Sequence, residues 1–148
     1  MRAVVQRVTS ASVSVDNVTI ASISNGLMVL IGITHSDSEK DICWMSDKLL
    51  GLRLFPDTDG KMNRSVMECN GELLLVSQFT LYGDCKKGKR PSFIDAAKSE
   101  NAEPLFNKFV TEMTAHYPKI QTGKFGSNMA VTLVNDGPVT LILESTRN

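Results

Sequence analysis

The chain has 148 residues, of which 42% are hydrophobic, and its 16 acidic residues balance its 16 basic residues. This length suits one domain spanning 1–148, and the composition excludes a disordered chain. The zero net charge indicates no class of partner, and no apolar run approaches the roughly 18 residues of a membrane span.

The first third of the chain predicts strands joined by tight turns. Valine and isoleucine, which favour strands, are concentrated in segments 4–8, 12–15, 18–23 and 27–33. Asn25 and Gly26 separate the last two segments. Both residues tolerate the positive φ of a type I′ turn, so we expect a β-hairpin there.

A first helix is predicted after these strands. Ser38 and Asp41 form a capping-box pattern, and apolar residues then recur at helical spacing until Gly51. Segment 56–60, Pro-Asp-Thr-Asp-Gly, has the composition of a surface loop. Asn70 and Gly71 mark another turn, and 73–79 is apolar enough for a central strand covered on both faces.

A second helix and two more strands complete the predicted elements. Apolar residues between Leu105 and Met113 share one helical face, with Pro104 in the first turn and Pro118 at the end. Segments 129–134 and 139–144 read as strands that place Gly137-Pro138 at a hairpin tip. The expected class is α+β, with a mixed or largely antiparallel sheet and two main helices.

The sequence lacks the residues that several common catalytic mechanisms require. His35 and His116 are the two histidines, and neither is placed beside a nucleophile as a Ser-His-Asp triad requires. Carboxylates, histidines and cysteines show no metal-ligand spacing, so we expect neither a metal nor a cofactor. The three cysteines are odd in number and widely spaced, which favours a reducing, cytoplasmic location.

A basic segment follows the 73–79 strand. Its cations are Lys86, Lys87, Lys89 and Arg90. Residues 83–89 fit the G-x-x-x-x-G-K pattern of a phosphate-binding loop, but Arg90 stands where such a loop needs Ser or Thr, and Pro91 follows. A nucleotide hydrolase is therefore a weak alternative. The segment is either a solvated loop or a surface that holds RNA phosphates.

Two sequence motifs carry a resemblance to a known family. They are Ser77-Gln78-Phe79-Thr80-Leu81 and Asn135-Asp136-Gly137-Pro138-Val139-Thr140. Together, in this order and on a chain of this length, they resemble the paired motifs of the D-aminoacyl-tRNA deacylases. A related family that clears L-alanine from tRNA carries Pro-Gln-Ala-Thr-Leu at the first motif, which favours the D-specific reading.

The resemblance implies a barrel-like homodimer in which the Gly137-Pro138 bond is cis and enters the partner's active site. The two carbonyl oxygens of this unit would receive the α-ammonium group of the substrate. A D side chain would then project to solvent, whereas an L side chain would meet the loop. Glycine would pass this filter, so glycyl-tRNA mischarged on an alanine tRNA is an expected second substrate.

The ester of an aminoacyl-tRNA is already activated, so its hydrolysis needs positioning and oxyanion stabilisation more than a strong nucleophile. We expect main-chain N–H groups near Phe79 and Thr80 to face the oxyanion, with water attacking, helped by the ribose 2′-hydroxyl. Thr80 is the alternative nucleophile, but no base stands beside it in the motif. Ser77 and Gln78 are expected to support this site by hydrogen bonds.

The remaining expected contacts concern the tRNA end and the second motif. Phe125 is a candidate for stacking on the terminal adenine, with Met129 beside it. Arg7 is expected to hold the Gly137-Pro138 loop by donating to its backbone oxygens, with a surface ion pair as the alternative. Neighbouring residues of the motif would support the loop: Asn135, Val139 and Thr140. The rival hypothesis is a protein that binds tRNA ends without cutting them; no DNA or membrane partner is expected.

Overall fold

The computed structural model describes residues 1–145, and a six-stranded mixed sheet forms its centre. The strands run in the order β2 (Val18–Ile23), β1 (Arg2–Val15), β3 (Gly26–Gly32), β6 (Glu72–Ser77) and β7 (Ile120–Thr122), while β8 (Ala130–Glu144) pairs with β1. A separate two-stranded sheet joins β4 (Phe55–Pro56) to β5 (Met62–Arg64). The helices are α1 (Glu39–Gly51), the short 3-10 helix η1 (Phe79–Tyr82) and α2 (Ser99–His116).

The hairpin predicted at Asn25-Gly26 is wrong, because β1 lies between β2 and β3 in the sheet. The first hairpin instead joins β1 to β2, with Val15 paired to Val18. Asp16 and Asn17 form its turn with φ of 50° and 63°. Two successive positive φ angles suit a type I′ turn, which Asx residues tolerate better than most. Predicted strands 4–8 and 12–15 are halves of the single strand β1.

Gly26 allows strands β3 and β6 to pack closely against each other. It opposes Glu72 in the parallel β3–β6 pair, and a Cβ at Gly26 would lie 1.8 Å from the Glu72 carbonyl oxygen. A side chain would separate the two strands. The glycine therefore allows β6 to lie against β3, which sets the position of the segment that follows β6.

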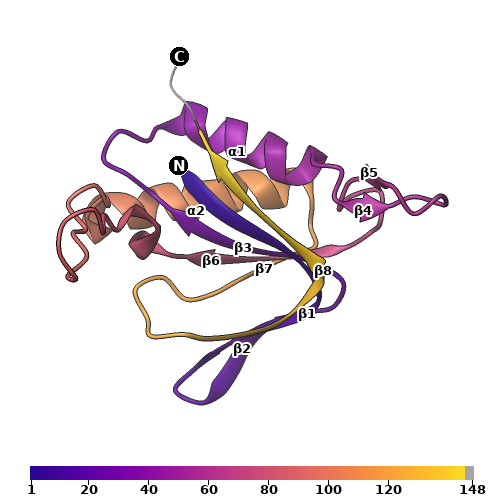
Figure 1. The fold of residues 1–148 in the computed structure, drawn as a ribbon, viewed down its shortest axis with the longest axis horizontal. Coiled ribbons are helices and arrows are strands. Elements are labelled where there is room, and N and C mark those ends of the chain that lie inside the picture. Colours follow the sequence, from indigo (N-terminus) through magenta and orange to yellow (C-terminus); the bar gives the residue numbers. More distant parts are fainter. Residues whose placement is uncertain (146–148) are drawn as a thin grey trace.

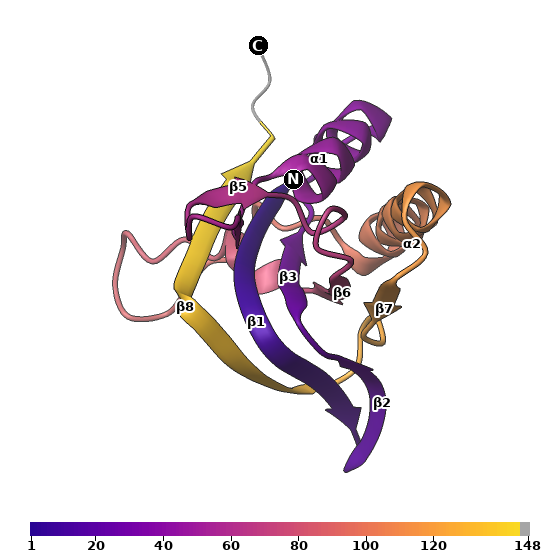
Figure 2. The same ribbon diagram turned by 90° about the vertical axis from the view of Figure 1, so that its right-hand side faces the viewer.

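The hairpin predicted around Gly137-Pro138 is also wrong, since β8 is one strand paired with β1 over most of its length. Its register shifts where Gln6 pairs with Thr140 and Val8 pairs with Asn135, so residues 136–139 stand opposite Arg7 alone. Such an irregularity accommodates proline, which has no N–H to give to the ladder. Both β1 and β8 curve strongly (Figure 2).

Both helices cover the same face of the sheet and lie side by side (Figure 1). α1 begins at the predicted Ser38–Asp41 capping box and ends at Gly51. α2 begins at Ser99, so Pro104 lies inside the helix and not in its first turn. Within residues 1–145, no helix is long and apolar enough to cross a membrane.

Side chains of β3 and β6 alternate between two cores, as expected for strands covered on both faces. Leu27 and Leu73 pack under the helices, whereas Met28 and Leu74 pack on the opposite face. There the sheet curls until β2 approaches β6 and β7, which encloses the second core. The predicted class is confirmed: α+β, with a mixed, barrel-like sheet and two main helices.

Candidate active site

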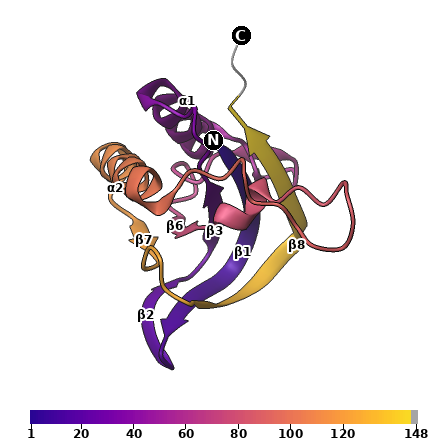
Figure 3. The ribbon, with the colours of Figure 1, turned by 90° about the vertical axis from the view of Figure 1, so that its left-hand side faces the viewer.

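The first motif lies where β6 ends. The strand stops at Ser77, two residues before the predicted boundary, and the Gln78 N–H donates to the Ile31 carbonyl at 2.7 Å. The chain then turns into η1, which begins at Phe79. Phe79 and Thr80 are therefore exposed helix residues and not strand residues. In Figure 3, η1 is the short pink coil near the end of β3.

Among residues 1–145, two main-chain N–H groups at the start of η1 have no backbone hydrogen-bond acceptor. Its first hydrogen bond runs from the Leu81 N–H to the Gln78 carbonyl at 3.3 Å. The N–H groups of Phe79 and Thr80 come before this bond and have no acceptor inside the helix. Neighbouring N–H groups of this kind suit a developing negative charge.

The Thr80 hydroxyl is engaged by its neighbour. The Gln78 side-chain amide donates to Thr80 Oγ1 in a very short contact. An oxygen that accepts from an amide gains no help in losing its own proton, because the amide is not a base. Tyr82 offers no base either, since burial raises the pKa of its hydroxyl. This contact holds the Thr80 hydroxyl in place.

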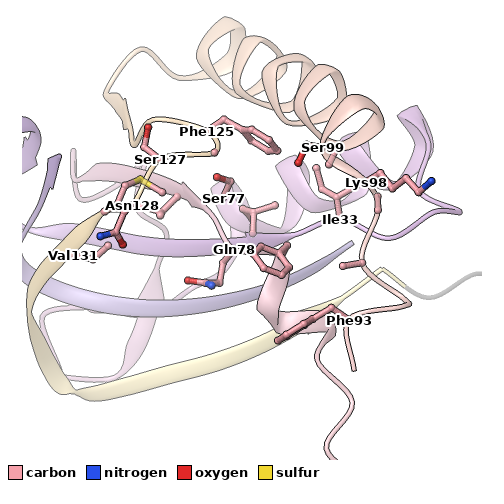
Figure 4. Close-up of a pocket in the computed structure, with 18 residues that line it drawn as sticks. Ile33, Ser77, Gln78, Phe93, Lys98, Ser99, Phe125, Ser127, Asn128 and Val131 are labelled. Carbon is pink, nitrogen blue, oxygen red and sulfur yellow. The ribbon is translucent and has the colours of Figure 1, made fainter. Parts of the chain in front are cut away.

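A cavity of about 590 Å³ opens beside this motif. Ser77, Gln78 and Phe79 line it, together with residues from the start of α2 and from the segment between β7 and β8. Figure 4 shows Phe125 and Phe93 at opposite sides of the cavity, with Ser77 and Gln78 between them. The volume lies within the usual range for pockets that hold small ligands.

The cavity wall offers little acid–base chemistry. Of the lining residues, Lys98 alone has a strongly ionisable side chain. In Figure 4 its side chain extends away from Ser77 and Gln78. His35 contacts the Ile94 carbonyl at 2.8 Å, and His116 lies at the end of α2; neither lines the cavity. Residues 1–145 contain no group of three or more His, Cys, Asp or Glu arranged to hold a metal ion.

Phe125 and Met129 both line this cavity, so the structure brings them together with the first motif. The Phe125 ring also packs against Phe106 of α2, with ring centroids 5.9 Å apart. This contact holds the ring in place while part of it stays available to the cavity. Gly123 lies close to Met129, where a Cβ would be 2.7 Å from the methionine sulfur.

The second motif does not line the cavity of its own chain. Gly137 and Pro138 are exposed on β8, and the bond between them is cis, as the resemblance implies. Asn135 closes the bend, because its Nδ2 donates to the carbonyls of Arg7 at 2.9 Å and Val139 at 3.0 Å. Thr140 donates to Asn135 Oδ1 at 3.3 Å. Within one chain, the two motifs remain apart.

Arg7 contacts this bend differently from the prediction. Its Nη1 donates to the Leu54 carbonyl at 2.6 Å, and its Nε lies 3.0 Å from Asp136 Oδ2. The Nε–H is not aimed at an acceptor well enough for a hydrogen bond, so the Asp136 contact is an ion pair. The predicted donation to the backbone oxygens of Gly137 and Pro138 is replaced by these two contacts.

The basic segment forms an exposed loop. Asp84 and Ser92 close its base through two backbone hydrogen bonds of 2.7 and 2.9 Å. The loop projects away from the sheet (Figure 3). All four cations are exposed: Lys86, Lys87, Lys89 and Arg90. No helix follows directly, because α2 begins only at Ser99, and this excludes the phosphate-binding loop of a nucleotide hydrolase.

Comparisons with known proteins agree with this arrangement. A family model described as D-Tyr-tRNA(Tyr) deacylase matches residues 4–144. The chain belongs to this family. The D-aminoacyl-tRNA deacylase of Desulfitobacterium hafniense is 55% identical over 148 residues, which cover 100% of this chain and 99% of the relative. The D-aminoacyl-tRNA deacylase of Thermotoga petrophila is 52% identical over 147 residues, which cover 99% of this chain and 99% of the relative.

Two solved structures resemble the fold of this D-Tyr-tRNA(Tyr) deacylase family member. The c-Myc DNA Unwinding Element Binding Protein has a TM-score of 0.95 and 45% identity, covering 99% of this chain and 100% of that one. A probable eukaryotic D-amino acid tRNA deacylase has a TM-score of 0.83 at 17% identity, covering 96% and 97%. The second likeness concerns the fold alone. The predicted enzyme class, a deacylase, is confirmed by the family match and the high identities.

Sequence reasoning missed several residues of the deacylase cavity. Phe93 makes an edge-to-face contact with Phe79, with ring centroids 5.2 Å apart. Ser99 and Ala102 come from the first turn of α2, and Ile31 comes from β3. These positions carry no local signal, because the cavity forms where distant segments meet.

Proposed function

We propose that this chain hydrolyses the ester bond of D-aminoacyl-tRNA in the cytoplasm and releases free D-amino acid and tRNA. The observation that carries the proposal is the placement of the first motif. Ser77, Gln78 and Phe79 border a cavity whose wall has no carboxylate or histidine. An activated ester is a substrate class that such a site can cleave by positioning and charge stabilisation.

In this proposal the N–H groups of Phe79 and Thr80 bind the oxyanion that forms when water attacks the ester carbonyl. The support is their position ahead of the first η1 hydrogen bond. Gln78 orients the Thr80 hydroxyl toward the reacting groups. The ribose 2′-hydroxyl of the substrate helps the attacking water by taking up its proton while passing its own proton to the departing 3′-oxygen; Lys98 is the ionisable lining residue, and its side chain extends away from the motif.

Gly137 and Pro138 would complete the site from a second copy of the chain. They are exposed on β8 and lie outside the cavity of their own chain, so another copy must supply them if they contact substrate. Their carbonyl oxygens would accept the α-ammonium of the substrate and leave no room for an L side chain. Glycyl-tRNA has no side chain to exclude and would also be cut.

The tRNA end would lie along the cavity and the basic loop. Phe125 offers part of a fixed ring for stacking of the terminal adenine, with Met129 alongside. The exposed cations of the loop would contact phosphates. A protein that binds tRNA ends without cutting them has the same surfaces, so activity must be measured directly.

The deciding experiment incubates the purified protein with D-tyrosyl-tRNA, L-tyrosyl-tRNA and glycyl-tRNA in parallel. We expect loss of the D and glycyl esters and persistence of the L ester. Equal loss of D and L esters would contradict the stereochemical filter. Survival of all three esters, with tRNA still bound, would favour the binding protein. An unpaired DNA oligonucleotide serves as competitor to compare nucleic-acid classes.

Complementation between two inactive variants tests the shared site. Gly32→Val should displace η1, because even a Cβ at Gly32 would lie 3.1 Å from Leu81 Cβ. Gly137→Val strains the second motif, since Gly137 has a φ of +119°. We expect each variant alone to be inactive and the co-expressed pair to regain activity. No recovery, in a mixture shown to contain mixed dimers, would place both motifs of one site on one chain.

A further inference from the structure

Arg2 contacts three groups around the end of η1. Its Nη1 donates to the Leu81 carbonyl at 2.7 Å, and its Nη2 donates to Glu144 Oε1 at 2.6 Å. The guanidinium carbon lies 4.7 Å from the centroid of the Tyr82 ring. Leu81 and Tyr82 are the last two residues of η1, whereas Glu144 is the last residue of β8.

The sheet register places Arg2 where it can make all these contacts. In β1, Arg2 pairs with Gly32 of β3 on one side and with Glu144 of β8 on the other. Gly32 has no side chain, and a Cβ there would lie 3.1 Å from Leu81 Cβ and 3.2 Å from the Tyr82 ring. η1 therefore rests on Gly32, and Arg2 reaches across it from the neighbouring strand.

The backbone hydrogen bonds at the ends of η1 are local in the described part of the chain. The Leu81 N–H donates to Gln78, and the Gly83 N–H donates to Thr80. The last carbonyls of a helix lack intrahelical donors, and a cation is favourable at that end. Arg2 satisfies the Leu81 carbonyl, which lies one residue beyond Thr80. A shift at Leu81 therefore moves the N–H groups at the start of so short a helix.

We propose that Arg2 is a positioning residue for the hydrolysis, acting through η1 on the N–H groups of Phe79 and Thr80. Arg2 is not among the residues that line the cavity, so its effect on the reaction would pass through η1. Its guanidinium fixes the angle of η1 by joining the Leu81 carbonyl to Glu144 while covering the Tyr82 ring. The inference rests on the proposed function for its effect on rate, but its effect on η1 is independent of that function.

The arrangement needs the planar fork of an arginine. One nitrogen serves Leu81 while another serves Glu144, and the flat face lies over an aromatic ring. A lysine ammonium keeps the charge but has a single nitrogen, so it holds one of these partners well. A guanidinium supplied from solution should fit the space left by Arg2→Ala, because the Arg2 side chain is 33% exposed.

The test measures kcat and KM for D-tyrosyl-tRNA with wild type, Arg2→Ala, Arg2→Lys and the control Arg53→Ala, an exposed arginine remote from η1. We expect Arg2→Ala to lower kcat by about 100-fold, the effect of a small misplacement of catalytic groups, with KM nearly unchanged. Arg2→Lys should lie between Arg2→Ala and wild type. Millimolar ethylguanidinium should raise the kcat of Arg2→Ala, whereas ethylammonium should not.

Amide NMR shifts of Phe79 and Thr80 give a readout without activity. They should move in Arg2→Ala and return with ethylguanidinium, while amides of α1 stay in place. If the wild type cuts no charged tRNA, the proposed function fails and these shifts still decide the position of Arg2. Unchanged shifts, or a loss of kcat matched by an equal loss of folded protein without rescue, would overturn the inference. If Arg2→Ala does not fold, Glu144→Gln tests the same link.

Discussion

Arg7 of β1 and Asp136 of β8 form an ion pair beside the exposed Gly137-Pro138 bend, with Arg7 Nε 3.0 Å from Asp136 Oδ2. The arginine side chain is 11% exposed and the aspartate 46%. The same arginine donates to the Leu54 carbonyl. One nearly buried cation thus joins the second motif to the segment that leads into β4.

Removing the charge of Asp136 tests this link. Asp136→Asn should lower the free energy of unfolding by about 1 kcal/mol, because Asp136 is half exposed and water replaces part of the interaction. Arg7→Lys should lower the free energy of unfolding more than Asp136→Asn does and should reduce the deacylation rate further, since one ammonium cannot reach both Leu54 and Asp136. Urea unfolding and initial rates measure both effects. Asp47→Asn, an exposed change in α1, is the control; equal effects in Asp47→Asn and Asp136→Asn would contradict the prediction.

Removing the Thr80 hydroxyl distinguishes orientation from nucleophilic attack. Thr80→Ala should lower kcat by about tenfold or less, because the proposed oxyanion donors are backbone groups that the variant keeps. Thr80→Ser retains the hydroxyl and should behave like wild type. Single-turnover rates on D-tyrosyl-tRNA provide the measurement. A loss near a million-fold, the scale seen when a nucleophile is removed, would make Thr80 the attacking group.

Adding one carbon at Gly32 tests whether the position of η1 depends on its close packing against this glycine. A Cβ there would lie 3.1 Å from Leu81 Cβ and 3.2 Å from the Gln78 carbonyl, so η1 must shift. Gly32→Ala should lower kcat by about 10- to 100-fold. Gly51→Ala is the matched control, because nothing lies within 4 Å of a Cβ at Gly51 and alanine favours its helix by about 0.5–1 kcal/mol. Full activity in Gly32→Ala would show that η1 tolerates displacement.

Acid should weaken the start of α1 through Asp41. Burial alone raises the pKa of this carboxyl, but hydrogen bonds from Ser145 and Ser38 outweigh burial, and the pKa is lowered overall. The stabilisation is therefore complete above the unfolded pKa of about 3.9 and disappears as pH falls through the lower folded value. Asp41→Asn should be less stable than wild type at pH 7, with a smaller difference near pH 3. A pH-independent difference in urea unfolding would contradict this.

Neutralising the basic loop should weaken tRNA binding and flatten its dependence on salt. The variant changes Lys86, Lys87, Lys89 and Arg90 to glutamine. Each lost phosphate contact removes about 0.7–0.9 from the slope of log affinity against log salt concentration. Lys40→Gln with Lys61→Gln is the control, because both lysines are exposed away from the loop. An unchanged slope would show that the loop is solvated and not bound to RNA.

Local signals predicted much of this fold. The Ser38–Asp41 capping box predicted the start of α1, and the apolar run at 73–79 predicted a strand covered on both faces, which ends at Ser77. Both depend on neighbours within a few residues or on one strand's own alternation. The mixed sheet followed from the mixture of strand and helix segments. The first motif was found because its residues are contiguous.

Pairing between distant segments escaped prediction. Thr9 and Ser10 are exposed and polar, so β1 looked like two strands, although it continues while its partner changes from β3 to β2. Gly26 was predicted to lie in a turn. A glycine is required there because the Glu72 carbonyl, 46 positions along the chain, leaves no room for a Cβ. The bend after Ser77 depends on the Ile31 carbonyl. Such contacts have no signature in neighbouring residues.

The alternation of β3 and β6 between two cores restricts how the length of the chain can vary. Inserting one residue between Glu72 and Leu73 would send Leu73 and Leu75 to the curled side of the sheet and Leu74 and Val76 to the helix side. Both cores would be repacked at once, and the motif after Ser77 would rotate with the strand. Natural length changes should therefore concentrate in segments such as 85–91, whose ends are fixed by the Asp84–Ser92 bridge.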